Sequence, residues 1–151
     1  MTSARDSDVD VVELARDAYR RGWSRTGDVS ASTRKSQAIS REWQTRVLTA
    51  DRARFAKEVR VSVEFRERID LIDQLTSTAY EMKVSGKNPT HEFFKDVFKV
   101  LEHNLSAGGQ IKRLVFLTDA AGVARLRRGL CRSLLANSHE LGFEIKLEPL
   151  D

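Results

Sequence analysis

Residues 68–86 of the chain read "RIDLIDQLTSTAYEMKVSG". The alternation of apolar and polar residues predicts two β-strands, one over "RIDLID" and one over "TAYEMKVS", separated by the polar "QLTS". Both strands carry charge where an apolar residue would pack better: Asp70 lies in the first, and Glu81 and Lys83 lie in the second. The chemistry expected of this segment depends on whether these side chains meet.

Side chains on a strand alternate between its two faces, so Glu81 and Lys83 share one face. If the two strands pair as an antiparallel hairpin, Asp70 converges with Glu81. Two neighbouring carboxylates repel each other, which raises a pKa unless a cation lies between them. Mg²⁺ suits such a pair, because it takes one or two carboxylates and completes its shell with water and substrate phosphate. With Lys83 orienting water or stabilising charge at phosphorus, the segment is suited to phosphodiester hydrolysis.

Two helices are predicted upstream of this segment. Apolar residues at helical spacing indicate a first helix over residues 8–21 and a long helix over about 37–57. The stretch between them is polar, so we expect the first helix to be a loosely attached arm. The chain is therefore expected to divide into residues 1–35, an N-terminal helix with a linker, and residues 36–151, the main domain. Alternating residues then predict a half-buried strand over 58–65.

The downstream half predicts a further helix, two strands and a basic helix. Asn88 and Pro89 mark a helix start. Strands are expected over 111–118 and 143–150, with the basic helix over about 120–138 between them. The helix after Pro89 is expected to turn four apolar residues inward: Phe94, Val97, Phe98 and Leu101. Three consecutive strands, a crossover helix and a buried strand predict an α/β fold with a mixed β-sheet flanked by helices.

Asp70, ten intervening residues and then Glu81-Met82-Lys83 resemble the motif of the PD-(D/E)XK nuclease superfamily. That superfamily includes restriction endonucleases, recombination exonucleases and junction resolvases. The resemblance covers roughly residues 37–118 and implies a restriction-endonuclease-like αβββαβ core, the order already indicated by periodicity. It departs from the family pattern in one place, because Ile69 stands where proline precedes the aspartate.

The resemblance also implies roles for the motif residues. Asp70 and Glu81 are expected to bind Mg²⁺ or Mn²⁺, with the backbone carbonyl of Met82 as a further ligand. Lys83 is expected to be the catalytic lysine. Many family members add a glutamate from the first helix of the core, and the candidates here are Glu42, which we favour, and its rivals Glu58 and Glu64.

Basic residues outside the motif are candidates for contacts with nucleic acid. Lys95 lies on the helix that follows the motif, where family members often add a polar residue to the site. The basic helix offers a possible phosphate-contacting face, because three of its arginines recur at helical spacing: Arg125, Arg128 and Arg132. A solvated helix face is the alternative interpretation of each set.

Composition narrows the class of protein. The 151 residues are 40% hydrophobic and 32% charged, as in a soluble globular protein. The 26 Lys and Arg residues and 22 Asp and Glu residues give a net charge of +4, which permits an anionic partner without requiring one. The single cysteine, Cys131, excludes an internal disulfide and a Cys-rich zinc site. Without an apolar run of about 18 residues or a signal peptide, no membrane association is expected, and the cytoplasm is the expected location.

The expected function is that of a metal-dependent nuclease acting on DNA. Double-stranded DNA is the first choice of substrate, a branched junction or single strand the next, and RNA, as cut by tRNA-cleaving toxins, the last. A domain of this size has little surface for reading a long site, so a homodimer or a larger complex is expected. Two alternatives stay open: a module of the same fold that binds nucleic acid or protein without cutting, and a small-molecule phosphodiesterase, which would require a closed pocket.

Overall fold

The computed structural model describes residues 8–23, 32–84, 88–106, 108 and 110–151. In chain order the elements are α1 (Val11–Trp23), α2 (Ser32–Ala50), β1 (Phe55–Arg60), β2 (Arg68–Asp73), β3 (Thr78–Lys83), α3 (Pro89–Ser106), β4 (Arg113–Thr118), α4 (Ala120–Leu126), α5 (Leu130–Ala136), the 3-10 helix η2 (Ser138–Leu141) and β5 (Glu144–Pro149). None of the helices in the described part of the chain is both long and apolar enough to cross a membrane.

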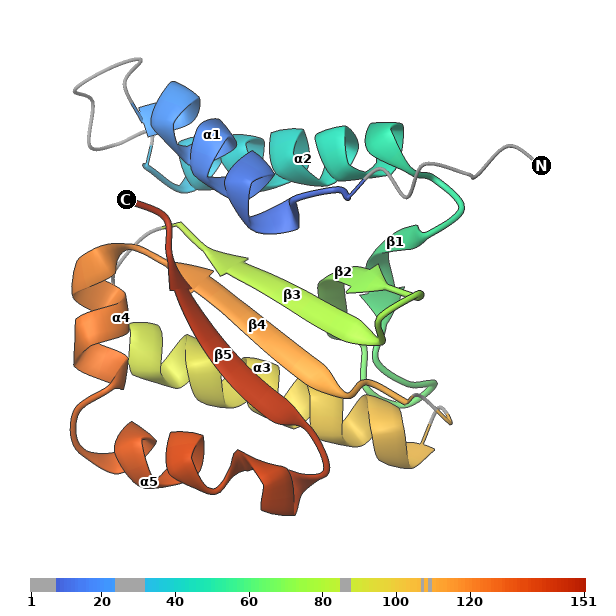
Figure 1. Ribbon diagram of the computed structural model, residues 1–151, viewed down its shortest axis with the longest axis vertical. Coiled ribbons are helices and arrows are strands. Elements are labelled where there is room, and N and C mark those ends of the chain that lie inside the picture. The colour runs from blue at the N-terminus through green and yellow to red at the C-terminus, as the bar shows by residue number, and fades with distance from the viewer. Residues whose placement is uncertain (1–7, 24–31, 85–87, 107, 109) are drawn as a thin grey trace.

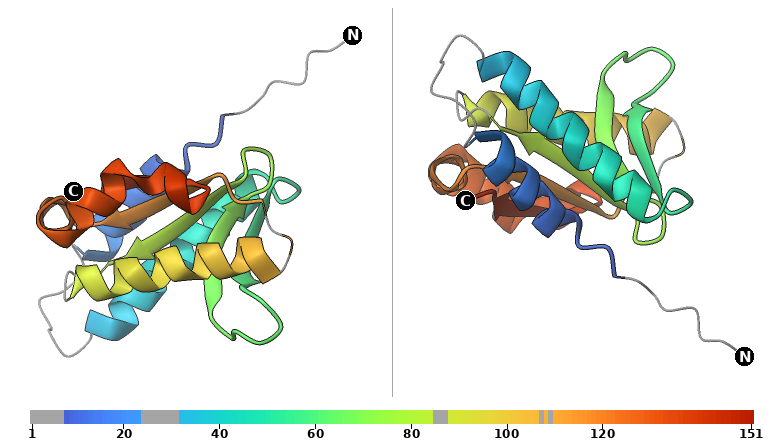
Figure 2. Two further views of the ribbon diagram at one scale, coloured as in Figure 1. Left: turned by 90° about the horizontal axis from the view of Figure 1, so that it is seen from below. Right: turned by 90° about the horizontal axis from the view of Figure 1, so that it is seen from above.

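The strands form one five-stranded mixed sheet in the order β1-β2-β3-β4-β5 (Figure 1). β1, β2 and β3 pair antiparallel as successive hairpins, whereas β4 and β5 continue the sheet in parallel with β3. Helices α1 and α2 cover one face, and α3, α4 and α5 cover the other (Figure 2). The predicted α/β class, with a mixed sheet flanked by helices, is therefore confirmed.

β4 shows how the sheet separates two apolar cores. Leu114 and Phe116 belong to the core beneath α3, while Val115 and Leu117 belong to the core beneath α1 and α2. A strand buried on both faces has no position at which a polar residue is favoured, which explains its continuous apolar sequence.

Helix α1 is packed against α2 and the sheet, so the expectation of a loosely attached arm is wrong. Ala15 and Ala18 are completely buried, and such small residues let two helices approach closely. The indole Nε1 of Trp43 on α2 donates a hydrogen bond to the carbonyl of Val11, at 3.1 Å. The linker expected between the two helices falls largely on residues 24–31, which lie outside the described residues.

The boundary between α2 and β1 lies earlier than the sequence predicts. Helix α2 ends at Ala50 rather than near Lys57, and a carboxylate oxygen of Asp51 accepts a hydrogen bond from the backbone N–H of Arg54, at 3.1 Å. β1 begins and ends earlier as well, and its last residue is Arg60. The apolar alternation continues into the β1–β2 connection, where Val63 is 87% exposed. Alternation predicted strand there, but no partner strand covers it.

Helix α3 begins at Pro89, as predicted, but it faces the core along a different stripe. Phe93, Val97 and Val100 are buried, whereas Phe94 and Phe98 are exposed by 40% and 51%. The prediction that Phe94 and Phe98 point inward is therefore wrong. The observed buried stripe is displaced from the predicted one by one residue, or 100° around the helix. This displacement determines which polar side chains of α3 face the sheet.

The basic helix predicted over 120–138 is broken in two. Gly129 has a φ of 61°, a conformation that an α-helix cannot contain and that glycine adopts readily. Arg125 consequently lies on α4 and Arg132 on α5, so the arginines do not share the face of one continuous helix.

A buried ion pair joins the start of β1 to the end of β2. The guanidinium of Arg54 donates to both oxygens of Asp73, at 2.9 and 2.8 Å, and the hydroxyl of Thr76 donates to Asp73 at 2.8 Å. Burial by itself raises the pKa of Asp73, but these hydrogen bonds outweigh burial and hold the pKa below its ordinary value.

We predict that Asp73→Asn lowers the free energy of unfolding by roughly 3 kcal/mol, because it leaves a largely buried guanidinium without its charged partner. Since the pKa of Asp73 is depressed, its stabilising contribution is present above the unfolded value of about 4 and is lost as the pH falls through the folded value. Urea titrations at several pH values measure both effects. An unchanged stability at pH 7, or an unaltered loss of stability on acidification, would contradict the prediction.

Candidate functional site

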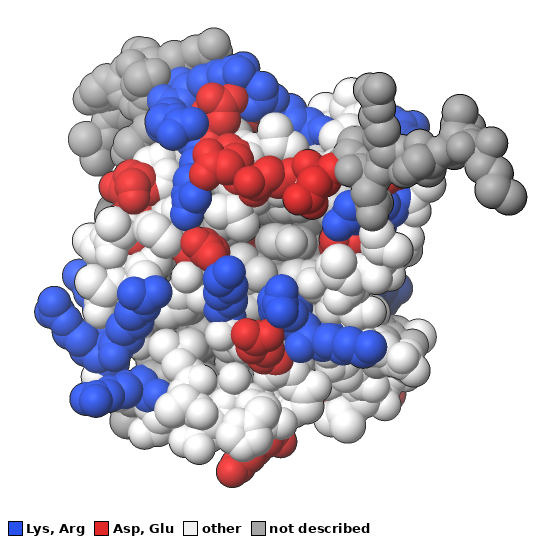
Figure 3. All heavy atoms as spheres, in the orientation of Figure 1, with Lys and Arg blue, Asp and Glu red and all other residues white. Residues whose placement is uncertain are grey.

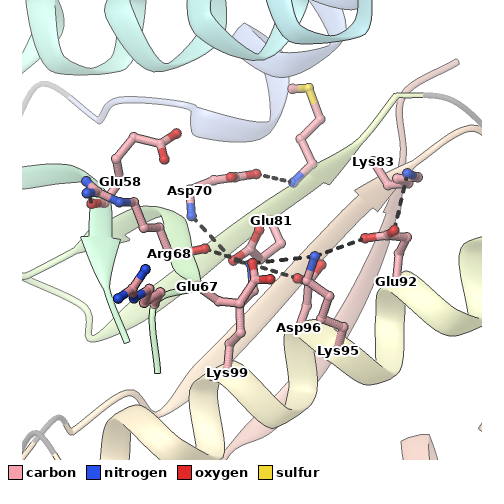
Figure 4. A pocket seen from close by; sticks show the side chains of 12 residues that line it. Glu58, Glu67, Arg68, Asp70, Glu81, Lys83, Glu92, Lys95, Asp96 and Lys99 are labelled. Atoms are coloured by element: carbon pink, nitrogen blue, oxygen red, sulfur yellow. Dashed lines mark hydrogen bonds and ion pairs between the residues drawn. The ribbon is translucent and has the colours of Figure 1, made fainter. Parts of the chain in front are cut away.

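The hydrogen-bond ladder between β2 and β3 stops at Asp70. Paired residues run from Asp73 and Thr78 to Leu71 and Tyr80, which makes Asp70 and Glu81 the next facing residues. There the side chains replace the ladder (Figure 4): the backbone N–H of Asp70 donates to Glu81 Oε1 at 3.3 Å, and the backbone N–H of Met82 donates to Asp70 Oδ2 at 3.0 Å.

The other edge of β2 is interrupted at the same residue. Pairing with β1 joins Lys57 to Leu71 and Val59 to Ile69, and passes over Glu58 and Asp70 between them. Glu58 has a φ of 50°, which is unusual for a residue other than glycine.

Gln44 reaches into this interruption from α2. Its side-chain Nε2 donates to Glu58 Oε1 at 2.8 Å and, at 3.4 Å, to the backbone carbonyl of Asp70. The buried Gln44 therefore connects the first helix of the core to the acidic residues.

Lys99 of α3 meets these acids from beneath the sheet. Its Nζ donates to Glu81 Oε1 at 2.8 Å and to the backbone carbonyl of Arg68 at 2.7 Å. It also forms an ion pair with Asp96 Oδ1 at 2.9 Å, one turn earlier on the helix. Glu81, Asp96 and Lys99 are all buried, so the charges interact where water screens them weakly.

Two carboxylates, Glu81 and Asp96, bind this one ammonium group, and Asp70 lies beside Glu81. The pKa values of all three acids are raised, chiefly by burial. Burial and the neighbouring charges of Asp70 and Asp96 hold the pKa of Glu81 well above its ordinary value. Burial raises the pKa of Asp96 to about 6, and it raises the pKa of Asp70 as well. Burial lowers the pKa of Lys99, but the nearby carboxylates outweigh it and the net shift is upward. The site therefore has an excess of negative charge, which a further cation would relieve.

These groups line an open pocket of about 450 Å³. Figure 4 shows the side chains of 12 residues around it, which come from β1, β2, β3, α3 and the connection before β2. They are Glu58, Arg66, Glu67, Arg68, Asp70, Glu81, Met82, Lys83, Glu92, Lys95, Asp96 and Lys99.

Lys83 lines the pocket but does not contact the acids of the motif. It lies toward the end of β3 and turns to Glu92, with Nζ and Oε1 3.6 Å apart, whereas Glu81 turns toward Lys99 (Figure 4). Lys95 is close by and pairs with Glu67 at 3.5 Å. Both lysines are partly exposed at the rim of the pocket.

Glu42 does not join the site, so the choice of this residue as the glutamate of the first helix is corrected. It forms an ion pair with Arg21 of α1 at 3.8 Å and is not among the residues that line the pocket. Of its two rivals, Glu58 lines the pocket, and Glu64 does not. Residues two positions apart lie on nearly opposite sides of a helix. Gln44 faces Asp70, so Glu42 lies on the side of α2 that faces α1.

The arginines of the divided basic helix also lie away from the pocket. Arg125, Arg128 and Arg132 are all exposed. Figure 3 shows Lys and Arg side chains gathered over α4 and the connection between α4 and α5, while acidic side chains form a band over α1. A contact of this basic surface with nucleic acid stays a prediction.

Sequence reasoning missed three residues of the site: Gln44, Asp96 and Lys99. The predicted inward stripe of α3, which includes Phe94 and Phe98, turns Asp96 and Lys99 away from the sheet. Phe93, Val97 and Val100 form an equally regular apolar stripe, and choosing it would have turned Asp96 and Lys99 toward the sheet.

The donor set fits a hard divalent cation, although it is small. In the described ranges, no group of three or more His, Cys, Asp or Glu side chains is arranged to hold a metal ion. Mg²⁺ needs only one or two carboxylates beside water and substrate oxygens. Asp70 and Glu81 converge, they carry raised pKa values, and one cation, the ammonium of Lys99, is already bound beside them. This arrangement fits Mg²⁺ or Mn²⁺ better than the softer metals.

The chain has no match among protein-family models, curated proteins or solved structures. No relative therefore supplies a function or assigns a role to any residue. The function is inferred from the residues that line the pocket.

We predict that Glu81→Gln raises the free energy of unfolding at pH 7 by about 1 kcal/mol, because a neutral amide removes the repulsion from two carboxylates. Both hydrogen bonds to Glu81 end on Oε1, so the amide oxygen of glutamine can accept them. Chemical denaturation measures the change. The matched control is Asp73→Asn, the same kind of substitution at a buried acid that is fully paired. A loss of stability at both positions would contradict the prediction.

Proposed function

We propose that the protein is a metal-dependent nuclease that hydrolyses phosphodiester bonds, with DNA as its preferred substrate, and that its core is restriction-endonuclease-like. The observation that carries the proposal is the convergence of Asp70 and Glu81 where the β2–β3 ladder stops, inside an open pocket. The motif resemblance supports the same assignment, since these acids are the two ligands that it implies. Residues with a strained backbone and carboxylates with a perturbed pKa are concentrated at functional sites.

The surroundings of the pocket favour a polymeric substrate over a small molecule. The pocket is open, and it has basic groups at its rim, among them Arg66, Arg68 and Lys95. Phe94 and Phe98 are partly exposed on neighbouring turns of α3, and the partly exposed Lys95 lies between them in sequence. Exposed aromatic rings among basic side chains are suited to nucleic acids, whose bases stack and whose phosphates attract positive charge.

Each residue of the proposed site has a distinct role. Asp70 and Glu81, with the backbone carbonyl of Met82, would hold the divalent cation. That ion, when bound, supplies Lewis-acid stabilisation of the phosphoryl oxygens and lowers the pKa of an attacking water. The hydrogen bond from the Met82 N–H orients the Asp70 carboxylate. Lys83, only weakly paired with Glu92, can turn its ammonium toward the scissile phosphate and stabilise the developing charge.

We predict Mg²⁺- or Mn²⁺-dependent cleavage when the protein is incubated with supercoiled plasmid, linear duplex DNA, a four-way junction, single-stranded DNA and total tRNA. Asp70→Asn and Glu81→Gln should abolish cleavage, because each removes a carboxylate from a two-carboxylate site. Lys83→Met should slow it on the order of a hundredfold, the usual contribution of one positioned group. Gel electrophoresis of the products measures these effects.

Glu42→Gln is the matched control, because it removes a carboxylate of α2 that lies outside the pocket, and it should cleave like the parent protein. Cleavage of tRNA alone would indicate an RNA-cleaving nuclease. Cleavage that persists in EDTA or in Asp70→Asn would contradict the proposed site.

One observation favours a second candidate, a module of the same fold that binds nucleic acid without cutting it. The ammonium of Lys99 already neutralises part of the acidic charge, so the acids have a cationic partner within the chain itself. Such a module would bind DNA equally well in Mg²⁺ and in EDTA and would cleave none of the substrates.

A further inference from the structure

The ammonium of Lys99 is fully engaged in the structure. Its three N–H groups have three acceptors: Glu81 Oε1 at 2.8 Å, Asp96 Oδ1 at 2.9 Å and the backbone carbonyl of Arg68 at 2.7 Å. Only 6% of the side chain is exposed. Lys99 thus serves as the cation of the acidic site in the state that the structure describes.

This ammonium and a divalent ion bound at Asp70 and Glu81 would need the same carboxylate. Glu81 Oε1 accepts from both Lys99 and the backbone N–H of Asp70, so a metal ion that uses this oxygen competes with Lys99 for it, and one that uses Oε2 lies on the same carboxylate as the ammonium. A dication on Glu81 would also repel an ammonium a few ångströms away, strongly so in a buried site. The two cations therefore compete for Glu81.

Asp96 gives Lys99 a second place to bind. It lies on the same helix, three residues earlier, and is not a residue of the motif. If the bond to Glu81 breaks, the ammonium can stay on Asp96 and turn into the pocket, which both residues line. Only rotation about side-chain bonds is needed.

We propose that Lys99 is a resident counter-ion that a divalent cation displaces from Glu81. The displaced ammonium stays beside Asp96 and faces the pocket, where a substrate phosphate would meet it. Lys99 is then a positioning residue for the carboxylates before metal binding and a phosphate contact afterwards. This inference rests on the proposed metal site of Asp70 and Glu81.

Lysine acylation of the intact protein, read by mass spectrometry, tests the displacement directly. Without metal, the buried Lys99 should react slowly. Addition of Mg²⁺ should raise its labelling several-fold, while the exposed Lys112 stays constant. In Asp70→Asn, which lacks a ligand, Mg²⁺ should leave the labelling of Lys99 unchanged. The main comparison is between the parent protein with and without Mg²⁺, so it does not depend on whether a Lys99 variant folds.

Metal affinity gives an independent readout. Lys99→Met removes the competing charge and should bind Mn²⁺ on the order of tenfold more tightly or better, as measured by electron paramagnetic resonance of free Mn²⁺. Lys112→Met, the same substitution at an exposed lysine, should match the parent protein. Circular dichroism verifies that each variant is folded.

The outcomes separate this inference from the nuclease assignment. Mn²⁺ binding by the parent protein that depends on Asp70, with Lys99 labelling unchanged by metal, would overturn the inference and leave the metal site intact. Unchanged affinity in a folded Lys99→Met variant would overturn it as well. Failure of both the parent and Lys99→Met to bind Mn²⁺ would overturn the inference and the proposed function together.

Discussion

The interruption of the sheet at Asp70 is the constraint on which the rest of the site depends. A buried backbone group must find a partner, and at this residue neither neighbouring strand provides one. The side chain of Glu81 takes the N–H, and the amide of Gln44 approaches the carbonyl. The acids are therefore part of the hydrogen bonding of the sheet, which argues against their being mere surface charge on an amphipathic hairpin.

Strand β2 carries two acids with opposite electrostatic character, only three residues apart. Asp73 is held by two nitrogens of one guanidinium, and its pKa is depressed, so its charge stabilises the fold. Asp70 faces Glu81, which shares a single lysine with Asp96, and the pKa values of these three carboxylates are raised. The same fold neutralises one acid fully and leaves three nearby acids only partly neutralised. The stability of the fold does not require these three acids, which argues that they serve a function.

The sheet half of the site could be predicted from the sequence, and the helix half could not. The period of two in "RIDLID" and "TAYEMK" fixes which residues share a face, and hairpin pairing then brings Asp70 opposite Glu81. Helix α3 allows two apolar stripes, and only packing on the sheet, with Phe93 against Phe116 at 5.5 Å between ring centroids, selects the one that buries Lys99. The break at Gly129 had a local signal in the glycine itself, which the basic periodicity around it obscured.

The way in which α3 is anchored decides which parts of the site can move. Its backbone is fixed by the buried stripe of Phe93, Val97 and Val100, and Asp70 is fixed by its bonds to β3. Lys99 combines a long flexible stem with a strongly hydrated point charge, and such a group can exchange partners without moving the helix. A rigid frame of acids with one movable cation is the arrangement that the proposed displacement of Lys99 by a metal ion requires, because only a side chain has to change partners.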